Sequence, residues 1–416
     1  MFRPVGCCVS GIQVRRKRIE FYNQVSSGEW QEKPVVASYQ MVIQTESWTD
    51  KVANKRTYRY LVTNYYCGGN VSPVFKNLFK DPELGFLPWV GTAMRLDIKD
   101  ATEGGDVYRL NEDDGRIFTF LPLPSEQHSS TGLPAFVHGF FALEQNRKYI
   151  KWPGSHRYLD IHMDKGLLWN QCMLREALPR CYVSMVMEAI RLHSATGRLT
   201  VTSIYRAFPD LSKIERKWEP IMSLVYIEIL KYPVVFHSSP GVQEWVEPKN
   251  AIFNTLDPTE EATAVIVEVL AASSVKIVNI PDHFLQAIRK YCHFSLGSIT
   301  APIVAGACKD VQFNSSLHWE HKMKLLRYFL KQTKYELLDG LQLLPLANGG
   351  FDLFHFNPKK ADRPIYIAPS EEMQSLLPGL KDDFLESDID EDIKTMLMKA
   401  AMRGETYSGS VSLLLL

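Results

Sequence analysis

The sequence predicts an α+β fold in which a mixed sheet comes first and a helical bundle with short strand hairpins follows. Apolar residues alternate with a period of two in the first 150 residues, and from about Gly166 the period changes to 3.6, which is typical of amphipathic helices. We therefore expect a strand-rich region at 1–150, a mainly helical region at 151–335, and a small α/β piece with a flexible tail at 336–416.

The strands are predicted where every second side chain shares a face. Segments 35–43 and 57–63 alternate in this way. Asp113-Asp114-Gly115 is a turn signal, and it predicts a hairpin between 107–110 and 117–121. Residues 135–143 form another apolar run, which we expect to be a strand buried on both faces.

The helices are predicted where apolar residues recur at spacings of three and four. Such faces are formed by Val183, Val186, Met187 and Ile190, and again by Trp319, Met323, Leu326 and Leu330. Further helices are expected at 263–270 and 393–402, with short strands at 234–236 and 245–246. A turn at Asn348-Gly349-Gly350 predicts a hairpin that joins 341–346 to 351–354.

The composition is that of a soluble globular protein. The chain has 416 residues, 45% of them hydrophobic, and its 47 basic and 47 acidic side chains give a formal net charge of +0. This balance argues against a dedicated nucleic-acid or membrane binder, and no apolar window approaches the roughly 18 residues of a membrane-spanning helix. The seven cysteines contain no CxxC pair, so we expect reduced, mostly buried thiols, as in a protein of the cytosol or nucleus. Of the two compartments we favour the cytoplasm.

Arg15-Arg16-Lys17-Arg18 is the most basic run in the chain. It is compatible with a nuclear signal or a nucleic-acid patch. The plainer interpretation is a solvated strand with a bulge, because Ile12 and Val14 lie on one face and Ile19 and Phe21 on the other. We favour the strand, since no aromatic stacking platform accompanies the charge.

Candidate metal and thiol sites are weak in this sequence. His318 and His321 lie three residues apart on a predicted helix, but they lack the HExxH pattern of zinc hydrolases, and His156 and His162 are no better placed. We expect no metal site. Cys172 and Cys181 lie among apolar neighbours on a helical stretch, so we interpret them as structural thiols.

Motifs that cradle phosphates or carry a nucleophile are missing from the sequence. No GxxxxGK[ST], GxGxxG or GxSxG occurs, which argues against an autonomous enzyme and against a bound cofactor.

Several ordered motifs resemble the repeated region of the sacsin-type proteins. Residues 115–134 read GRIFTFLPLPSEQHSSTGLP, and VHGFFAL at 137–143 and Asn146-Arg147 follow. In the same order lie LPWVG at 87–91, LWNQ at 168–171 and LQLLPLANGGF at 341–351. The resemblance spans about residues 85–355, and a match of this length with the same order is specific. Gly132 is expected to supply the turn before the strand at 137.

The resemblance implies a position within a larger plan. Sacsin-type repeats begin with an ATPase half of the GHKL group, similar to the ninety-kilodalton heat-shock chaperones, and a middle part follows. This chain would form most of that middle part. It lacks the N-box helix, the DxGxG motif and the glycine-rich lid of the ATPase half, and it lacks the His-Pro-Asp tripeptide of a J domain. ATP is then expected only with an ATPase half supplied from upstream.

Three functions remain open at this point. The resemblance favours a non-enzymatic chaperone-type or chaperone-regulating scaffold module that contacts protein clients and heat-shock chaperones, with no nucleic-acid or membrane partner. The alternative is half of a split or degenerate GHKL-type ATPase. A weaker third hypothesis is a nucleic-acid-associated protein that uses Arg15–Arg18.

Arg147 is the one candidate catalytic residue. In the heat-shock relatives, a middle-domain loop carries an arginine that reaches the terminal phosphate bound by the ATPase lobe. Asn146-Arg147-Lys148 follows the run at 140–143, about where such a loop would leave the sheet. An arginine there would supply a planar fork of donors to the transferred phosphoryl group. The plainer interpretation is a solvated basic turn.

Overall fold

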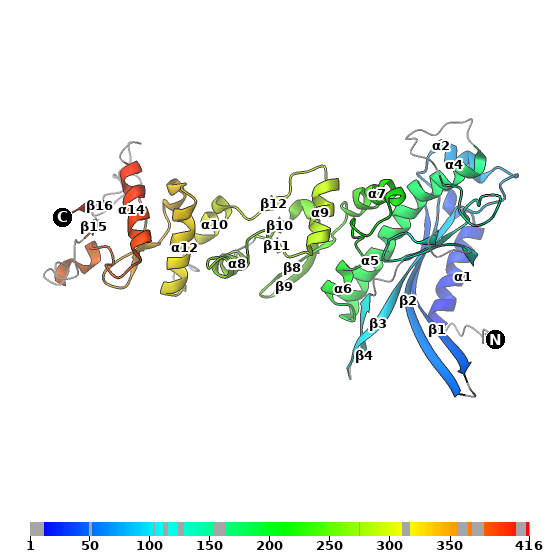
Figure 1. Cartoon of the computed structure of the whole chain (residues 1–416), viewed down its shortest axis with the longest axis horizontal. Coiled ribbons are helices and arrows are strands. Elements are labelled where there is room, and N and C mark those ends of the chain that lie inside the picture. The colour runs from blue at the N-terminus through cyan, green and yellow to red at the C-terminus, as the bar shows by residue number, and fades with distance from the viewer. Residues whose placement is uncertain are drawn as a thin grey trace. The chain divides into compact units, whose positions relative to one another are not determined.

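The computed structural model describes residues 12–49, 52–102, 105–110, 115–123, 129–152, 164–273, 275–309, 317–355, 365–367, 378–404 and 413–415. Its helices and mixed sheets confirm the predicted α+β class. The described residues form two compact units (Figure 1). The first contains those of Met1–Phe236, Trp245–Pro248 and Ile280–Ser295, and the second contains those of His237–Glu244, Lys249–Asn279 and Leu296–Leu416. The division at 150 and 335 stays a prediction.

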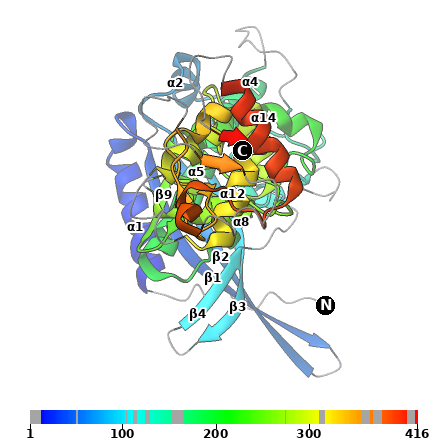
Figure 2. The ribbon, with the colours of Figure 1, turned by 90° about the vertical axis from the view of Figure 1, so that its left-hand side faces the viewer.

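A mixed sheet is the framework of the first unit. Its strands run in the order β1-β2-β3-β7-β5-β6 in the described part of the chain, and β4 pairs with β3 beside that path. The strands are β1 (Val35–Thr49), β2 (Val52–Tyr66), β3 (Trp89–Thr102), β4 (Gly105–Leu110), β5 (Ile117–Thr119), β6 (Leu121–Pro122) and β7 (Phe136–Gly139). Strands β1 to β3 are antiparallel, whereas β5 runs parallel to β7. Figures 1 and 2 show β1–β2 and β3–β4 extending past the helices as two long ribbons.

The described helices of the first unit are α1 (Ile12–Ser26), α2 (Pro73–Phe79), α4 (Lys165–Cys172), α5 (Leu178–Thr196), α6 (Val201–Tyr205), α7 (Glu219–Ile229) and α9 (Asp282–Tyr291). Helix α5 packs on β1, β2 and β3, whereas α7 packs on α5 and α9 packs on α7. The short helical segments are η1 (Glu29–Gln31), the π-helical η2 (Met173–Ala177) and η3 (Arg216–Trp218). Helix α4 begins at the N-cap Asp164, and α5 ends at Gly197 with a left-handed φ of 64°. The predicted helix around Val183–Ile190 is therefore confirmed as part of α5.

The sheet presents alternate residues to α5, as its period of two requires. Leu61, Thr63, Val90 and Thr92 are buried, and the Sγ atom of Cys181 on α5 lies 3.6 Å from the carbonyl oxygens of Thr63 and Val90. The predicted alternation at 35–43 and 57–63 is confirmed, because β1 and β2 pair in register from Val35↔Tyr66 to Thr49↔Val52.

The predicted hairpin between 107–110 and 117–121 is wrong. Strand β4 pairs with β3, from Leu96↔Leu110 to Thr102↔Gly105, and β5 pairs with β7 and β6. Another edge of β4 is used by the segment after α5, because Tyr108 N donates to Arg198 O at 2.7 Å and Leu110 N to Ser203 Oγ at 2.6 Å. Residues 111–114, which include most of the turn signal, lie outside the described residues.

The interpretation of Arg15–Arg18 as a strand is also wrong. These residues lie in α1, where Val14 is buried and Lys17, Phe21 and Val25 are half-buried. Spacings of three and four place these side chains on one helical face, whereas Arg15, Arg16 and Arg18 are exposed. The apolar positions from Ile12 to Phe21 are compatible with either a bulged strand or a helix, so they did not distinguish the two.

A second, smaller sheet has the strand order β12-β10-β11-β8-β9 in the described part of the chain. It is made of β8 (Val235–Ser239), β9 (Val242–Val246), β10 (Ile252–Phe253), β11 (Ile277–Val278) and β12 (Gly297–Ser298), of which Val235, Phe236, Trp245 and Val246 belong to the first unit and the other residues to the second. The remaining described helices are η4 (Pro248–Asn250), α8 (Thr263–Ala272), α10 (Ala301–Cys308), α12 (Trp319–Lys331), η5 (Tyr335–Leu338), η6 (Pro378–Asp383) and α14 (Glu391–Gly404). The remaining strands are β13 (Leu344–Pro345), β14 (Phe351–Asp352), β15 (Ile365–Ile367) and β16 (Leu413–Leu415).

Most local predictions for the second unit are confirmed. Helix α12 buries Met323, Leu326 and Leu330 in the core, although Trp319 remains 40% exposed. Strands β13 and β14 form the predicted hairpin, with Gly349 at a φ of 82° in its turn. Within the part of the chain that the structure describes, no helix is both long and apolar enough to span a bilayer.

Candidate functional site

Arg147 lies at the tip of a short hairpin that leaves β7. The hairpin closes where Leu143 bridges Ile150, and Glu144 N donates to Tyr149 O at 2.9 Å. Below this, Lys151 N donates to Ala142 O at 2.8 Å. The chain therefore leaves the sheet and returns over a few residues, as the sequence predicted for this segment.

The turn holds Arg147 in an uncommon backbone conformation. Its φ is 54°, in the left-handed region that few non-glycine residues adopt. Arg147 N donates to Glu144 O at 2.9 Å, and Lys148 N donates to Asn146 Oδ1, also at 2.9 Å. The residue is exposed, and its guanidinium forms no ion pair with a described residue. The predicted contact of Arg147 with a phosphate stays a prediction.

Residues of the LWNQ motif anchor the base of this hairpin. Asn170 is 0% exposed; its Nδ2 donates to Ala142 O at 2.8 Å and to Lys151 O at 2.7 Å, and its Oδ1 accepts from Ala142 N at 2.7 Å. Trp169 Nε1 donates to Phe140 O at 2.5 Å. A buried polar side chain whose hydrogen bonds are all made fixes the segments it joins. Helix α4 thus determines the position of the Arg147 hairpin.

The sheet face opposite α5 carries a cluster of aromatic side chains that are only partly buried. We call it the aromatic face, and it consists of Tyr60, Trp89, Phe118, Phe120, Phe136, His138 and Phe140. Ring centroids lie 4.9 Å apart for Trp89–His138, 4.5 Å for Phe120–Phe140 and 6.2 Å for Tyr60–Phe136. The strand at 135–143 is therefore buried on one face only, because Val137 is fully buried whereas Phe136, His138 and Phe140 are half-buried.

Phe120 is the most exposed member of the aromatic face. It is 63% exposed and has a φ of 62°, which is strained for a bulky residue. Phe120 N donates to His138 Nε2 at 3.2 Å. Burial lowers the pKa of His138, so its imidazole is held neutral and can accept this hydrogen bond. In the sequence, the alternation of Phe136, His138 and Phe140 indicated that these side chains share one face of a strand. It could not show whether another element covers that face.

The two helical cysteines are free and buried. Burial raises the pKa of Cys172 and that of Cys181 to about 12. Cys181 Sγ also lies 3.4 Å from Thr92 Oγ1. Neither thiol has the electropositive, exposed surroundings of a nucleophile, which agrees with the predicted structural role.

The other candidate residues are not brought together. The ring centroids of His318 and His321 lie 6.0 Å apart, and His321 Nδ1 is 3.5 Å from Glu268 Oε2. Across the described ranges, no group of three or more His, Cys, Asp and Glu side chains is placed to hold a metal ion. His156 and His162 lie outside the described residues. On α1, Arg16 Nε pairs with Glu20 at 3.0 Å.

Comparison with known proteins places the chain in its sequence context. No model of a known protein family matches it. Human sacsin is 31% identical to it over 373 residues, a match that covers 88% of this chain and 8% of sacsin. The chain thus spans less than a tenth of the length of this relative. Over most of its length, the chain is a sacsin-like protein.

Proposed function

We propose that this chain is a chaperone-type scaffold module that contacts protein clients or partner chaperones in the cytoplasm, without catalysing a reaction itself. The proposal includes no nucleic-acid partner, no membrane partner and no cofactor within this chain. The aromatic face carries the argument, because it offers partly solvated apolar side chains on a rigid sheet.

The physical case rests on the area that such a face can bury. An aromatic side chain can bury roughly 150–250 Å², and each such burial contributes strongly to an interface. Phe120 and Phe140 pack edge to face at 4.5 Å, so the rings are ordered before a client arrives. A preordered surface loses less conformational entropy on binding. The expected client is a non-native polypeptide that exposes its own apolar side chains.

The test is suppression of aggregation of a heat-denatured model enzyme, citrate synthase, measured by light scattering. We expect the chain to suppress scattering and Phe120→Ser to lose most of this effect. Ile98→Ser is the matched control, because Ile98 is 45% exposed on β3 but is not part of the aromatic face. Equal suppression by both variants, or none by the unsubstituted chain, would contradict the proposal.

A second candidate function is that of half an ATPase, completed by a GHKL-type half from upstream. Arg147 favours it, because its side chain is exposed at the tip of a hairpin whose base Asn170 fixes. A fixed arginine is what the stabilisation of a transferred phosphoryl group requires. ATP would then be bound by the other half, and this chain would supply only the arginine. ATP turnover by the mixed halves, with and without Arg147, tests this candidate.

A further inference from the structure

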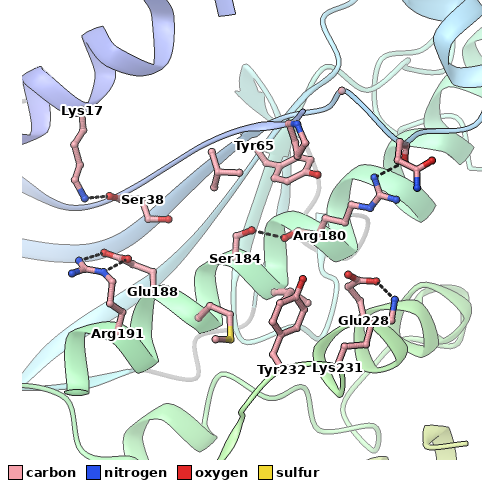
Figure 3. A pocket seen from close by; sticks show the side chains of 16 residues that line it. Lys17, Ser38, Tyr65, Arg180, Ser184, Glu188, Arg191, Glu228, Lys231 and Tyr232 are labelled. Atoms are coloured by element: carbon pink, nitrogen blue, oxygen red, sulfur yellow. Dashed lines mark hydrogen bonds and ion pairs between the residues drawn. The ribbon is translucent and has the colours of Figure 1, made fainter. Parts of the chain in front are cut away.

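A groove of about 1010 Å³ opens in the first unit between α1, the first residues of β1, and helices α5 and α7 (Figure 3). We call it the α5 groove. It lies on the side of the sheet that α5 covers, and is therefore a different surface from the aromatic face. Its lining side chains include Lys17, Val36, Ser38, Tyr65, Arg180 and Tyr232.

One continuous face of α5 forms a wall of this groove. The lining residues of α5 are Arg180, Val183, Ser184, Met187, Glu188 and Arg191. Spacings of three and four place them on one side of the helix over about 16 Å, at a rise of about 1.5 Å per residue. Val36 on β1 is 41% exposed and Tyr232 beyond α7 is 37% exposed. The groove thus has apolar side chains within a polar rim.

The acidic side chains of the groove are paired with basic ones, but two of its basic side chains have no acidic partner in the part of the chain that the structure describes. Glu188 forms two hydrogen bonds of 2.7 Å to Arg191, and Glu228 accepts one of 2.7 Å from Lys231. By contrast, Lys17 Nζ donates to Ser38 O at 2.6 Å, and Arg180 Nη1 donates to Asn70 O at 3.0 Å. Among the described residues, neither cation has a carboxylate partner. Two positive charges therefore remain for an acidic ligand.

The arrangement distinguishes between forms of ligand. Strand addition at the edge of β1 would need the Ser38 carbonyl, but Lys17 already occupies it. A single small anion would have to reach both cations, yet Figure 3 shows Lys17 and Arg180 at opposite sides of the groove. A helix can present acidic residues on successive turns and apolar residues between them. Helix-in-groove recognition uses such i, i+3, i+4 and i+7 anchors.

We propose that the α5 groove binds an amphipathic helix of a partner protein, with its apolar side against Val36, Met187 and Tyr232 and acidic residues facing Lys17 and Arg180. The partner's carboxylates would form ion pairs with Lys17 and Arg180, which have none within the described ranges of the chain. This contact differs from client capture on the aromatic face, so either can fail while the other stands.

The test is a selection from a yeast-displayed library of 16-residue peptides against the full chain. Counter-selection uses the Val36→Glu/Tyr232→Glu chain, whose two substituted side chains are already partly in solvent. We expect the enriched peptides to be acidic, with apolar residues at helical spacing. The best one, made synthetically, should bind at least tenfold more weakly to Lys17→Glu and to Arg180→Glu by fluorescence anisotropy, and more weakly as salt rises.

Arg198→Glu is the matched control, because Arg198 is exposed just beyond α5 and does not line the groove. It should leave the affinity unchanged, and circular dichroism should show that every variant is folded. If Arg180→Glu does not fold, Lys17→Glu still tests whether a groove cation contributes to binding. Basic or extended enriched peptides, binding that ignores both charge reversals, or no enrichment over the counter-selection would overturn the proposal.

Discussion

The side-chain amide of Asn170 lies against the backbone of Ala142 as a neighbouring strand would. It accepts a hydrogen bond from Ala142 N–H and donates one to the Ala142 carbonyl, and its second amide hydrogen reaches Lys151 O. One buried residue of α4 thus satisfies three backbone groups at the base of the Arg147 hairpin. This contact couples α4 to the hairpin that carries Arg147, the candidate catalytic residue of the sequence.

Replacing Asn170 should therefore destabilise the fold strongly. Asn170→Ala leaves the Ala142 N–H and the Lys151 carbonyl without this partner, whereas the Ala142 carbonyl keeps the hydrogen bond from Lys151 N. Because each unpaired group costs about 1–3 kcal/mol, we expect a loss of at least about 2 kcal/mol in the free energy of unfolding, measured by urea denaturation. Asn77→Ala on the exposed side of α2 is the control and should change stability by less than about 0.5 kcal/mol. Similar stabilities of the two variants would refute the anchoring role.

Arg147 should affect ATP turnover without affecting the fold. In a mixture with a sacsin-type ATPase half, we expect turnover to fall by roughly 10³-fold or more in Arg147→Ala and sharply in Arg147→Lys, because lysine cannot reproduce the planar fork. Nucleotide affinity and melting temperature should hardly change, since the side chain is exposed. Lys148→Ala, which alters the adjacent exposed cation, is the control. Unchanged turnover in Arg147→Ala would leave Arg147 as surface charge.

The buried thiols should react slowly at neutral pH. With pKa values raised to about 12, Cys172 and Cys181 are almost entirely protonated in the folded chain. Because the ordinary thiol pKa is 9.0, the unfolded state loses these protons first as the pH rises. Stability should therefore fall between pH 9 and 12.

Alkylation of the native chain at pH 7.5, followed by mass spectrometry, measures how fast each thiol reacts. We expect Cys292, which is only partly buried, to be modified well before Cys172 and Cys181. Equally rapid modification of Cys181 would show that the helix opens readily and that burial does not protect it.

His138 should make the stability sensitive to mild acid. Its pKa is lowered by burial, and the buried Nδ1 has no hydrogen-bond partner among the described residues. Below about pH 6.5 the unfolded state takes up a proton more readily than the folded state does. The free energy of unfolding therefore decreases as the pH is lowered. Protonation of Nε2 would also remove the acceptor of Phe120 N–H.

Urea unfolding at pH 5.5 and 7.5 measures this effect. The loss of stability between the two pH values should be smaller in His138→Gln than in the unsubstituted chain. His283→Gln, which alters a histidine of α9 outside the aromatic face, is the control and should keep the full loss. An identical pH dependence in all three proteins would contradict the prediction.

The sequence by itself determined the fold class and most of the local elements. The helix around Val183–Ile190, the helix from Trp319 and the turn at Gly349 follow from periodicity and turn chemistry, which depend on neighbouring residues only. The order of the motifs also identified the sacsin-like relationship.

Only the tertiary structure decided which segments meet. The partner of β4 is β3 because distant residues fill its other edge, and no local turn signal reports that competition. Whether the alternating aromatics near His138 would be covered, and whether Lys17 and Arg180 would line the same groove, depended on packing between elements far apart in the chain. Periodicity specifies which side of an element is apolar, whereas burial of that side is a property of the neighbours that pack against it.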